Sequence, residues 1–181
     1  MAEAPEERKG VVTFKGNPVT LIGPELKVGD KAPDFDLFTT DLQPFKLSDA
    51  LAGGSRAALI IVVPSIDTSV CSLETVKFNR QTAELAKDKI ATFTVSVDLP
   101  FAQKRWCSSE KVDNVQLLSD YKDHTFGPNW GVTIKELGLL ARSVFLVDNA
   151  GVVRYVEIVP EIAMEPNYDD VIGAAKRLVG G

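Results

Sequence analysis

Ala57-Ala-Leu-Ile-Ile-Val-Val63 is the stretch that decides the fold, because all seven of its residues are apolar. A strand exposed on one face alternates apolar and polar residues, whereas a strand covered on both faces has an unbroken apolar run. Pro64 ends the run, and the pattern then predicts a helix over residues 69–86 and a second strand over residues 90–97. Such a strand–helix–strand unit predicts two parallel strands joined by a right-handed crossover.

Weaker patterns flank this unit. Upstream, two apolar segments around a Gly16-Asn17 turn predict an N-terminal β-hairpin, and a short strand is expected around Phe35. Downstream, Asp148-Asn-Ala-Gly151 is a strong turn signal between two apolar segments. The hairpin segments and the downstream elements are expected at residues 11–14, 18–22, 100–107 (helix), 115–118, 143–147, 152–159 and 167–179 (helix).

This order of elements predicts the fold class. A parallel pair followed by an antiparallel pair and a closing helix gives an α/β fold with a mixed central sheet flanked by helices. With the N-terminal β-hairpin added, the order fits a thioredoxin-like fold. We expect one such domain over residues 11–181, preceded by a flexible acidic tail over residues 1–10.

The composition excludes several classes of protein. The chain has 181 residues, a net charge of -5 and a pI near 5.0, so it lacks the basic surface that nucleic-acid binding needs. Its longest apolar run is far too short to span a bilayer. The charged N-terminus has no apolar stretch of the kind found in a signal peptide, which predicts a cytoplasmic protein.

The chain has two cysteines, Cys71 and Cys107, and contains no C-x-x-C motif. Two cysteines are too few for a disulfide scaffold, and in a reducing compartment such a pair is catalytic, redox-active or simply buried. A structural zinc site would need about four ligands, and His124 is the only histidine, so no metal is expected. His124 lies in a polar run, which predicts a solvated loop residue.

Cys71 has an informative position, in the first turn of the predicted helix directly after the buried strand. The start of a helix offers unpaired backbone N–H groups and a partial positive charge, and both favour a thiolate. Cys71 could equally be a small buried hydrophobic residue. Position alone leaves both interpretations open. We expect the buried stripe of this helix to comprise Leu73, Val76, Ala83 and Ala86.

The residues around Cys71 also resemble a known family. Pro64-Ser-Ile-Asp-Thr-Ser-Val-Cys71 matches the active-site pattern of the peroxiredoxins, and it is most similar to the thiol peroxidase subfamily. The resemblance extends from about residue 11 to the end of the chain. Further matching stretches are Gly16–Thr20, Asp98-Leu-Pro-Phe-Ala-Gln-Lys-Arg-Trp-Cys107, Leu140-Ala-Arg142 and Val159–Tyr168.

The resemblance implies a role for four residues around the peroxide. Cys71 would attack the terminal peroxide oxygen and become a sulfenic acid. Thr68 would form hydrogen bonds with both the thiolate and the peroxide, and Pro64 would shield the sulfenate from water. Arg142 would supply a fixed positive charge, because a guanidinium does not lose its proton at working pH. Without the family pattern, Arg142 would be interpreted as a surface arginine at the start of a strand.

The resemblance further implies an intrachain disulfide between Cys71 and Cys107, with Cys107 as the resolving cysteine. The substrates would be hydrogen peroxide and organic hydroperoxides, the electron donor thioredoxin, and the assembly a homodimer, with no metal, haem or flavin. Sulfurs in separate helices can bond only when their Cα atoms come within about 7 Å. We therefore expect the two helices that carry the cysteines to unwind partly during turnover.

Two other functions remain open at this point. One is a non-catalytic thioredoxin-like redox sensor or binding protein, and the other is a one-cysteine peroxiredoxin in which Cys107 is inert. Trp106 could either pack or contact a reductant. The connection over residues 131–140 is shorter and less glycine-rich than in many family members, which leaves the substrate preference and the dimer surface open.

Overall fold

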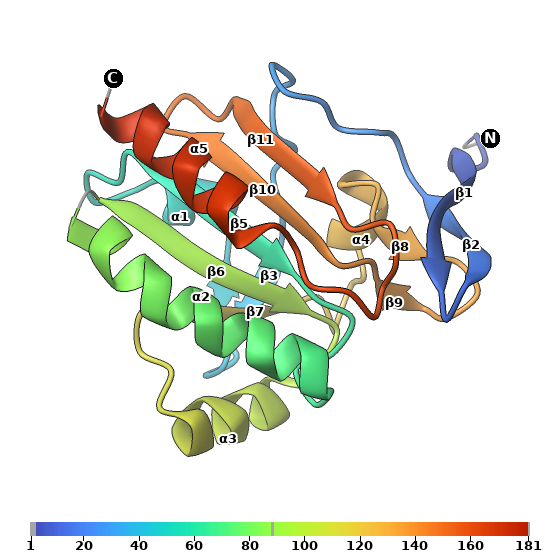
Figure 1. Cartoon of the computed structure of the whole chain (residues 1–181), viewed down its shortest axis with the longest axis horizontal. Helices are drawn as coiled ribbons and strands as arrows, with labels where there is room; N and C mark the ends of the chain where they lie inside the picture. Colours follow the sequence, from blue (N-terminus) through green and yellow to red (C-terminus); the bar gives the residue numbers. More distant parts are fainter. Residues whose placement is uncertain (1–2, 88, 181) are drawn as a thin grey trace.

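The apolar run at residues 57–62 forms a strand inside a seven-stranded mixed sheet in the computed structural model, which describes residues 3–87 and 89–180 (Figure 1). The strand order is β11-β10-β5-β6-β7-β3-β4. The bounds are β3 (Leu37–Thr39), β4 (Pro44–Phe45), β5 (Ala57–Val62), β6 (Ile90–Ser96), β7 (Gln116–Ser119), β10 (Ser143–Asp148) and β11 (Val153–Ile158). As predicted, β5 and β6 are parallel, and β10 and β11 form an antiparallel pair.

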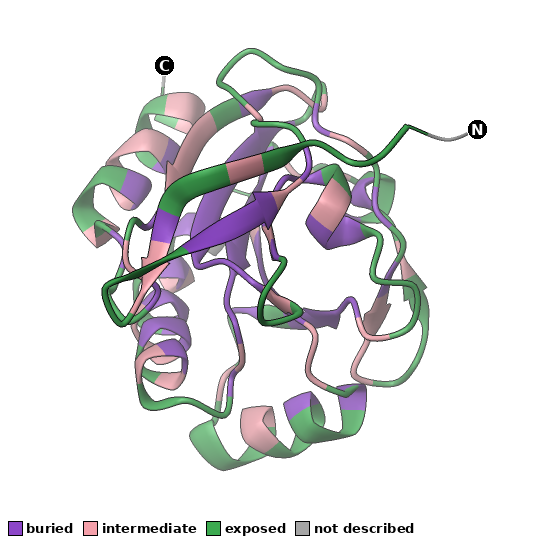
Figure 2. Ribbon diagram, turned by 90° about the vertical axis from the view of Figure 1, so that its right-hand side faces the viewer, coloured by how far each residue is buried: buried purple, intermediate pink, exposed green. Residues whose placement is uncertain are grey.

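The sheet separates two apolar layers. All six residues of β5 are buried, and its side chains alternate between the layers, with Ile60 on one side and Leu59 and Ile61 on the other. The continuous apolar run therefore reflects a strand that is covered on both faces. Figure 2 shows these buried strands between more exposed outer segments.

The three longer helices lie on one face of the sheet, whereas the two short ones bury side chains in the apolar layer of Ile60 on the other face. The helices are α1 (Leu47–Ala50), α2 (Ser69–Lys87), α3 (Pro100–Glu110), α4 (Phe126–Asn129) and α5 (Tyr168–Gly180). Helices α2 and α5 pack beside each other, α2 over β6 and α5 over β10 and β11, while α3 lies against β7 (Figure 1). Among the helices that the structure describes, none is long and apolar enough to cross a membrane.

The N-terminal hairpin belongs to a second sheet on the other side of the molecule. Its order is β1-β2-β8-β9, with β1 (Glu7–Phe14), β2 (Asn17–Ile22), β8 (Thr133–Ile134) and β9 (Leu139–Leu140). The hairpin was predicted, but β1 begins at Glu7, so residues 7–10 of the expected tail lie in a strand. Pairing with β2 explains this earlier start, and the Arg8 guanidinium donates a hydrogen bond to the Gly23 carbonyl at 3.0 Å.

Two local predictions are wrong. The strand expected at Phe35 is β3, two residues later, and Phe35 itself is a buried residue before it that packs on Phe126 and Trp130. The buried stripe of α2 is also different from the predicted one. Leu73 is 47% exposed, Val76 and Ala83 are half-buried, and the side chain of Ala86 lies outside the described residues. The buried face of α2 comprises Cys71, Glu74, Thr75, Phe78, Asn79, Thr82 and Leu85.

Candidate active site

Cys71 is the third residue of α2, which begins soon after β5 ends. Its side chain is completely buried, and Pro64, at the end of the β5 segment, is buried as well. The thiol group therefore sits in the first turn of a nineteen-residue helix, within a protein environment that excludes bulk water. In such a place the partial positive charge of the helix start and any nearby cation act on the sulfur with little screening.

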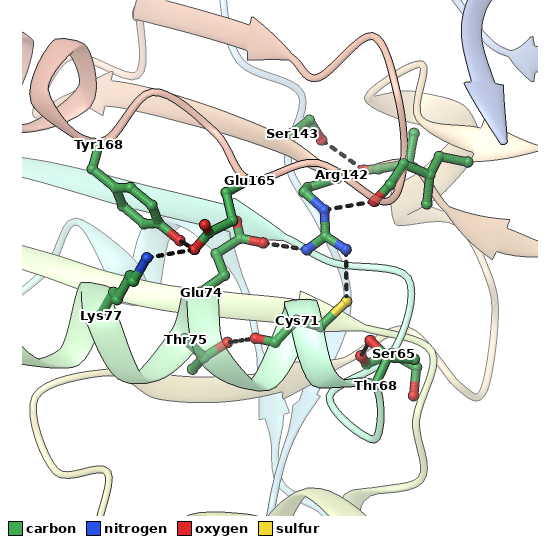
Figure 3. A network of polar contacts seen from close by, with 12 residues as sticks. Ser65, Thr68, Cys71, Glu74, Thr75, Lys77, Arg142, Ser143, Glu165 and Tyr168 are labelled. Carbon is green, nitrogen blue, oxygen red and sulfur yellow. Dashed lines mark hydrogen bonds and ion pairs between the residues drawn. The ribbon is translucent and has the colours of Figure 1, made fainter. Parts of the chain in front are cut away.

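That cation is Arg142, which lies between β9 and β10 and is only 2% exposed. Its Nη2 donates a hydrogen bond to Cys71 Sγ at 3.1 Å, its Nε donates to the Ile162 carbonyl oxygen at 2.9 Å, and its Nη1 donates to the Glu74 carboxylate (Figure 3). Because three nitrogens of the guanidinium each have their own acceptor, the group is fixed in both position and orientation. The charge of the guanidinium faces the sulfur directly.

The backbone around Arg142 is fixed by the connection over residues 131–140, which precedes it. This connection folds into the β8–β9 hairpin, which pairs with β2, and the Ala141 N–H donates to the Val132 carbonyl at 2.7 Å. The second sheet thereby holds the segment that delivers Arg142 to Cys71.

Glu74 is a site residue that the sequence pattern did not predict. It lies three residues after Cys71, on the same face of α2, and is fully buried. Burial raises the pKa of its carboxyl group to about 7, although the neighbouring Arg142 acts to lower it. Its Oε1 has no hydrogen-bond partner among the described residues. A glutamate on the inner face of a helix is the sequence signal that could have identified it, since buried charges are rare unless they are paired.

Replacing Glu74 with glutamine is expected to flatten the pH dependence of stability. With a raised pKa, the folded chain binds a proton between pH 4.5 and about 7 that the unfolded chain has released. The contribution of Glu74 to stability is therefore fully present below pH 4.5 and is lost as the pH rises through about 7, a change on the order of 3 kcal/mol. Urea unfolding at several pH values should show this loss in the wild type and not in Glu74→Gln.

A matched control for that experiment is Glu84→Gln, which changes an exposed glutamate on the same helix. Its free energy of unfolding should follow the wild-type pH dependence. Equal slopes for the wild type and Glu74→Gln over this interval would contradict the assignment of Glu74 as a buried titrating group.

A second set of polar contacts covers the far side of Glu74 (Figure 3). Lys77 forms an ion pair with Glu165 at 2.8 Å, and the Tyr168 hydroxyl donates to the same Glu165 carboxylate at 2.8 Å. The Tyr168 ring packs on Phe78 with ring centres 4.9 Å apart, and burial raises the pKa of Tyr168. The segment before α5 and the start of α5 therefore close the site on this side.

Thr68 is not bonded to Cys71 in this structure. It is exposed, and its hydroxyl donates to the Ser65 carbonyl at 3.1 Å (Figure 3). Of the predicted site residues, the structure thus brings together Cys71 and Arg142, while Thr68 lies in the loop that leads into α2.

Cys107 lies on α3, is half-buried, and like Cys71 is a free thiol. Burial raises the pKa of the Cys107 thiol, which disfavours its thiolate. The two cysteines therefore differ in electrostatic environment, because among the described residues a guanidinium donates a hydrogen bond to Cys71 and none donates to Cys107. Trp106, whose role the sequence left open, connects the two helices by donating from Nε1 to the Ser72 hydroxyl at 3.1 Å.

A cavity of about 460 Å³ lies between the two cysteine-bearing helices. Its lining includes Thr68, Ser69 and Ser72 at the start of α2, and Ala102, Arg105 and Trp106 on α3. The space next to the start of α2 is therefore open enough for a small molecule, or for movement of α3. His124 lies elsewhere, in an exposed loop as predicted, and no group of three or more His, Cys, Asp or Glu residues in the described part of the chain could hold a metal ion.

The chain belongs to the Redoxin family, whose model matches residues 27–172. It is 54% identical to a thiol peroxidase from Listeria monocytogenes serotype 4b over 166 residues, which are 92% of this chain and 98% of the relative. It is 50% identical to a thiol peroxidase from Bacillus subtilis over 168 residues, with 93% and 98% of the chains covered. Within the Redoxin family, the chain therefore falls among the thiol peroxidases and is a peroxiredoxin-type peroxidase.

Solved structures of similar proteins have the same fold. A peroxiredoxin-like protein from Aquifex aeolicus superposes with a TM-score of 0.84 at 45% identity, covering 97% of this chain and 99% of that one. A thiol peroxidase from Chromobacterium violaceum shares the fold, with a TM-score of 0.81 at 21% identity over 92% and 95% of the two chains. The predicted thioredoxin-like α/β fold is confirmed.

Proposed function

We propose that Cys71 is the peroxide-reducing nucleophile of this peroxidase. Its thiolate attacks the terminal oxygen of a hydroperoxide, the O–O bond breaks, and the other oxygen leaves as water or an alcohol after taking up a proton. Cys71 becomes a sulfenic acid, oxidised by two electrons. The observation that supports this role is the 3.1 Å hydrogen bond from Arg142 to the buried sulfur, because the same charge can stabilise the thiolate and the oxygen that leaves.

Thr68 and Pro64 would complete the site. A hydroxyl hydrogen rotates freely, so Thr68 can turn its bond from the Ser65 carbonyl toward an incoming peroxide. Pro64 is buried beside the loop and would limit the access of water to the sulfenic acid. For both residues the support is the match to the family pattern Pro64-x-x-x-Thr68-x-x-Cys71.

In the second step, the Cys107 thiol would attack the sulfur of the Cys71 sulfenic acid. A disulfide forms, and the sulfenic oxygen leaves as water. Reduced thioredoxin would then supply two electrons and return both thiols. Formation of the bond requires α3 and the start of α2 to approach, since they are separate helices whose cysteines are now unpaired.

Replacing Cys107 with serine separates the two steps. The variant is expected to react once with peroxide at the wild-type rate, because Cys107 makes no contact with Arg142 in the described structure. Its turnover rate with thioredoxin should fall at least about 100-fold, since the Cys71–Cys107 disulfide cannot form. Stopped-flow measurement of the first reaction and a thioredoxin-coupled assay check the two parts. A variant that turns over normally with thioredoxin would indicate a one-cysteine mechanism.

The full cycle is tested with thioredoxin, thioredoxin reductase and NADPH. Catalytic consumption of NADPH on addition of hydrogen peroxide or an organic hydroperoxide is expected. Stoichiometric oxidation without turnover would instead indicate a redox sensor.

We also propose a cytoplasmic homodimer on the basis of the family resemblance, and sedimentation of the reduced protein tests the dimer.

A further inference from the structure

The loop that leads to Cys71 is held by Asp98, a residue outside the site described above. Asp98 lies between β6 and α3, and its Oδ1 accepts a hydrogen bond from the Ser65 hydroxyl at 2.7 Å. Its Oδ2 accepts from the Ile66 N–H at 2.8 Å. Ser65 in turn accepts from the Asp67 N–H at 3.1 Å, and its carbonyl accepts from Thr68. The Asp98 carboxylate thus fixes the turn that precedes α2.

The same carboxylate is connected to α3, the helix of Cys107. The Ser96 hydroxyl donates to Asp98 Oδ2 at 2.6 Å and accepts from Gln103 Nε2 at 3.1 Å. Gln103 is completely buried, and its Nε2 also donates to the Leu118 carbonyl on β7 at 2.9 Å. The chain of hydrogen bonds therefore runs from the Cys71 loop through Asp98 and Ser96 to the fourth residue of α3.

Helix α3 buries little apolar surface, and its other contacts include the Trp106–Ser72 hydrogen bond and the exposed Lys104–Asp41 ion pair. Only Pro100 and Gln103 are buried in it, and Trp106 and Cys107 are partly buried. Cys107 follows Gln103 by four residues, so the two side chains lie on the same face of the helix. Helices with little apolar burial open at low cost in free energy. The hydrogen bonds of Gln103 therefore help to keep α3 in its reduced-state position, together with the Trp106–Ser72 hydrogen bond.

We propose that Asp98 and Gln103 are positioning residues that hold the two cysteine-bearing segments in the peroxide-reactive arrangement and delay disulfide formation. This inference rests on the proposed Cys71–Cys107 disulfide. We call the hydrogen bonds of Ser65, Asp98, Ser96 and Gln103 the network. While the network is intact, the Cys71 sulfenic acid stays away from Cys107. A second peroxide can then oxidise it to a sulfinic acid, and that peroxide is reduced to water or an alcohol. When the network opens, the disulfide forms instead. The network sets the ratio of these two products.

Ser65→Ala, Asp98→Asn and Gln103→Leu test this role. Each removes a hydrogen bond of the network, and loss of one such bond changes an equilibrium by about five- to tenfold. Each variant is expected to need about five times more peroxide than the wild type to convert half of Cys71 to sulfinic acid. Mass spectrometry of the cysteine peptides measures this ratio. Ser65→Ala is the mildest change and keeps the test valid if a larger one prevents folding.

Ser108→Ala is the matched control, because among the described residues the Ser108 hydroxyl donates only to the Lys104 carbonyl within α3. Its peroxide requirement should equal that of the wild type. An unchanged or lower requirement in Ser65→Ala and Asp98→Asn would overturn the positioning role while leaving the disulfide in place. A wild-type protein that forms no Cys71–Cys107 disulfide would overturn the proposed cycle and this inference together.

Discussion

Serine at position 71 is expected to abolish peroxide consumption, with a loss of about a thousandfold or more in rate. A serine hydroxyl is slightly smaller than the thiol and can still accept the hydrogen bond from Arg142. It cannot become a thiolate or be oxidised by a peroxide, so the loss would be chemical and not structural. The free energy of unfolding should change by about 1 kcal/mol or less. The thioredoxin-coupled assay and urea unfolding measure the two effects.

Cys107→Ser is the matched control for this change, since it also replaces a cysteine with serine. It should keep the first reaction with peroxide, which Cys71→Ser should lose. If Cys71→Ser still reduced peroxide and Cys107→Ser did not, the roles of the two cysteines would be reversed.

Arg142→Ala is expected to damage both the chemistry and the fold. The change removes the charge that faces Cys71 Sγ, and the reaction with peroxide should slow by about 100- to 1000-fold. It also leaves Glu74 buried without its cation, and breaking a buried ion pair in this way costs about 3 to 5 kcal/mol. Stopped-flow kinetics and urea unfolding separate the two losses.

The double variant Arg142→Ala/Glu74→Gln shows which loss belongs to which contact. Removal of the unpaired carboxylate should restore part of the stability, and the rate with peroxide should stay low. Arg154→Ala is the control, because the Arg154–Asp148 ion pair is partly exposed and surface pairs contribute little. A double variant that regained wild-type speed with peroxide would show that Arg142 acts only through the fold.

Patterns within single segments were sufficient to predict most of the fold. The unbroken run before Pro64 identified a strand covered on both faces, and the turn at residues 148–151 identified the antiparallel pair, because both signals are local. The start of β1 was not predictable in this way. Glu7 and Arg8 are polar, and they are part of a strand only because β2 pairs with them.

The candidate site was predictable only in part. The position of Cys71 at the start of a helix left its role open, and the family pattern indicated both Cys71 and Arg142. The hydrogen bond between Arg142 and Cys71 joins residues 71 positions apart in the sequence, and no local pattern predicts such a contact. Glu74 was missed because its polarity argues against burial until Arg142 is known to pair with it. The same polarity shifted the predicted stripe of α2 onto Leu73, which is exposed.

Mass spectrometry of the reduced protein after one equivalent of peroxide tests the central claim most directly. Two free thiols should lose two hydrogens, and the loss should map to a peptide pair linked through Cys71 and Cys107. A stable sulfenic acid at Cys71, trapped by dimedone with Cys107 still free, would contradict the disulfide cycle. An unmodified Cys71 with peroxide consumed would contradict its role as the nucleophile.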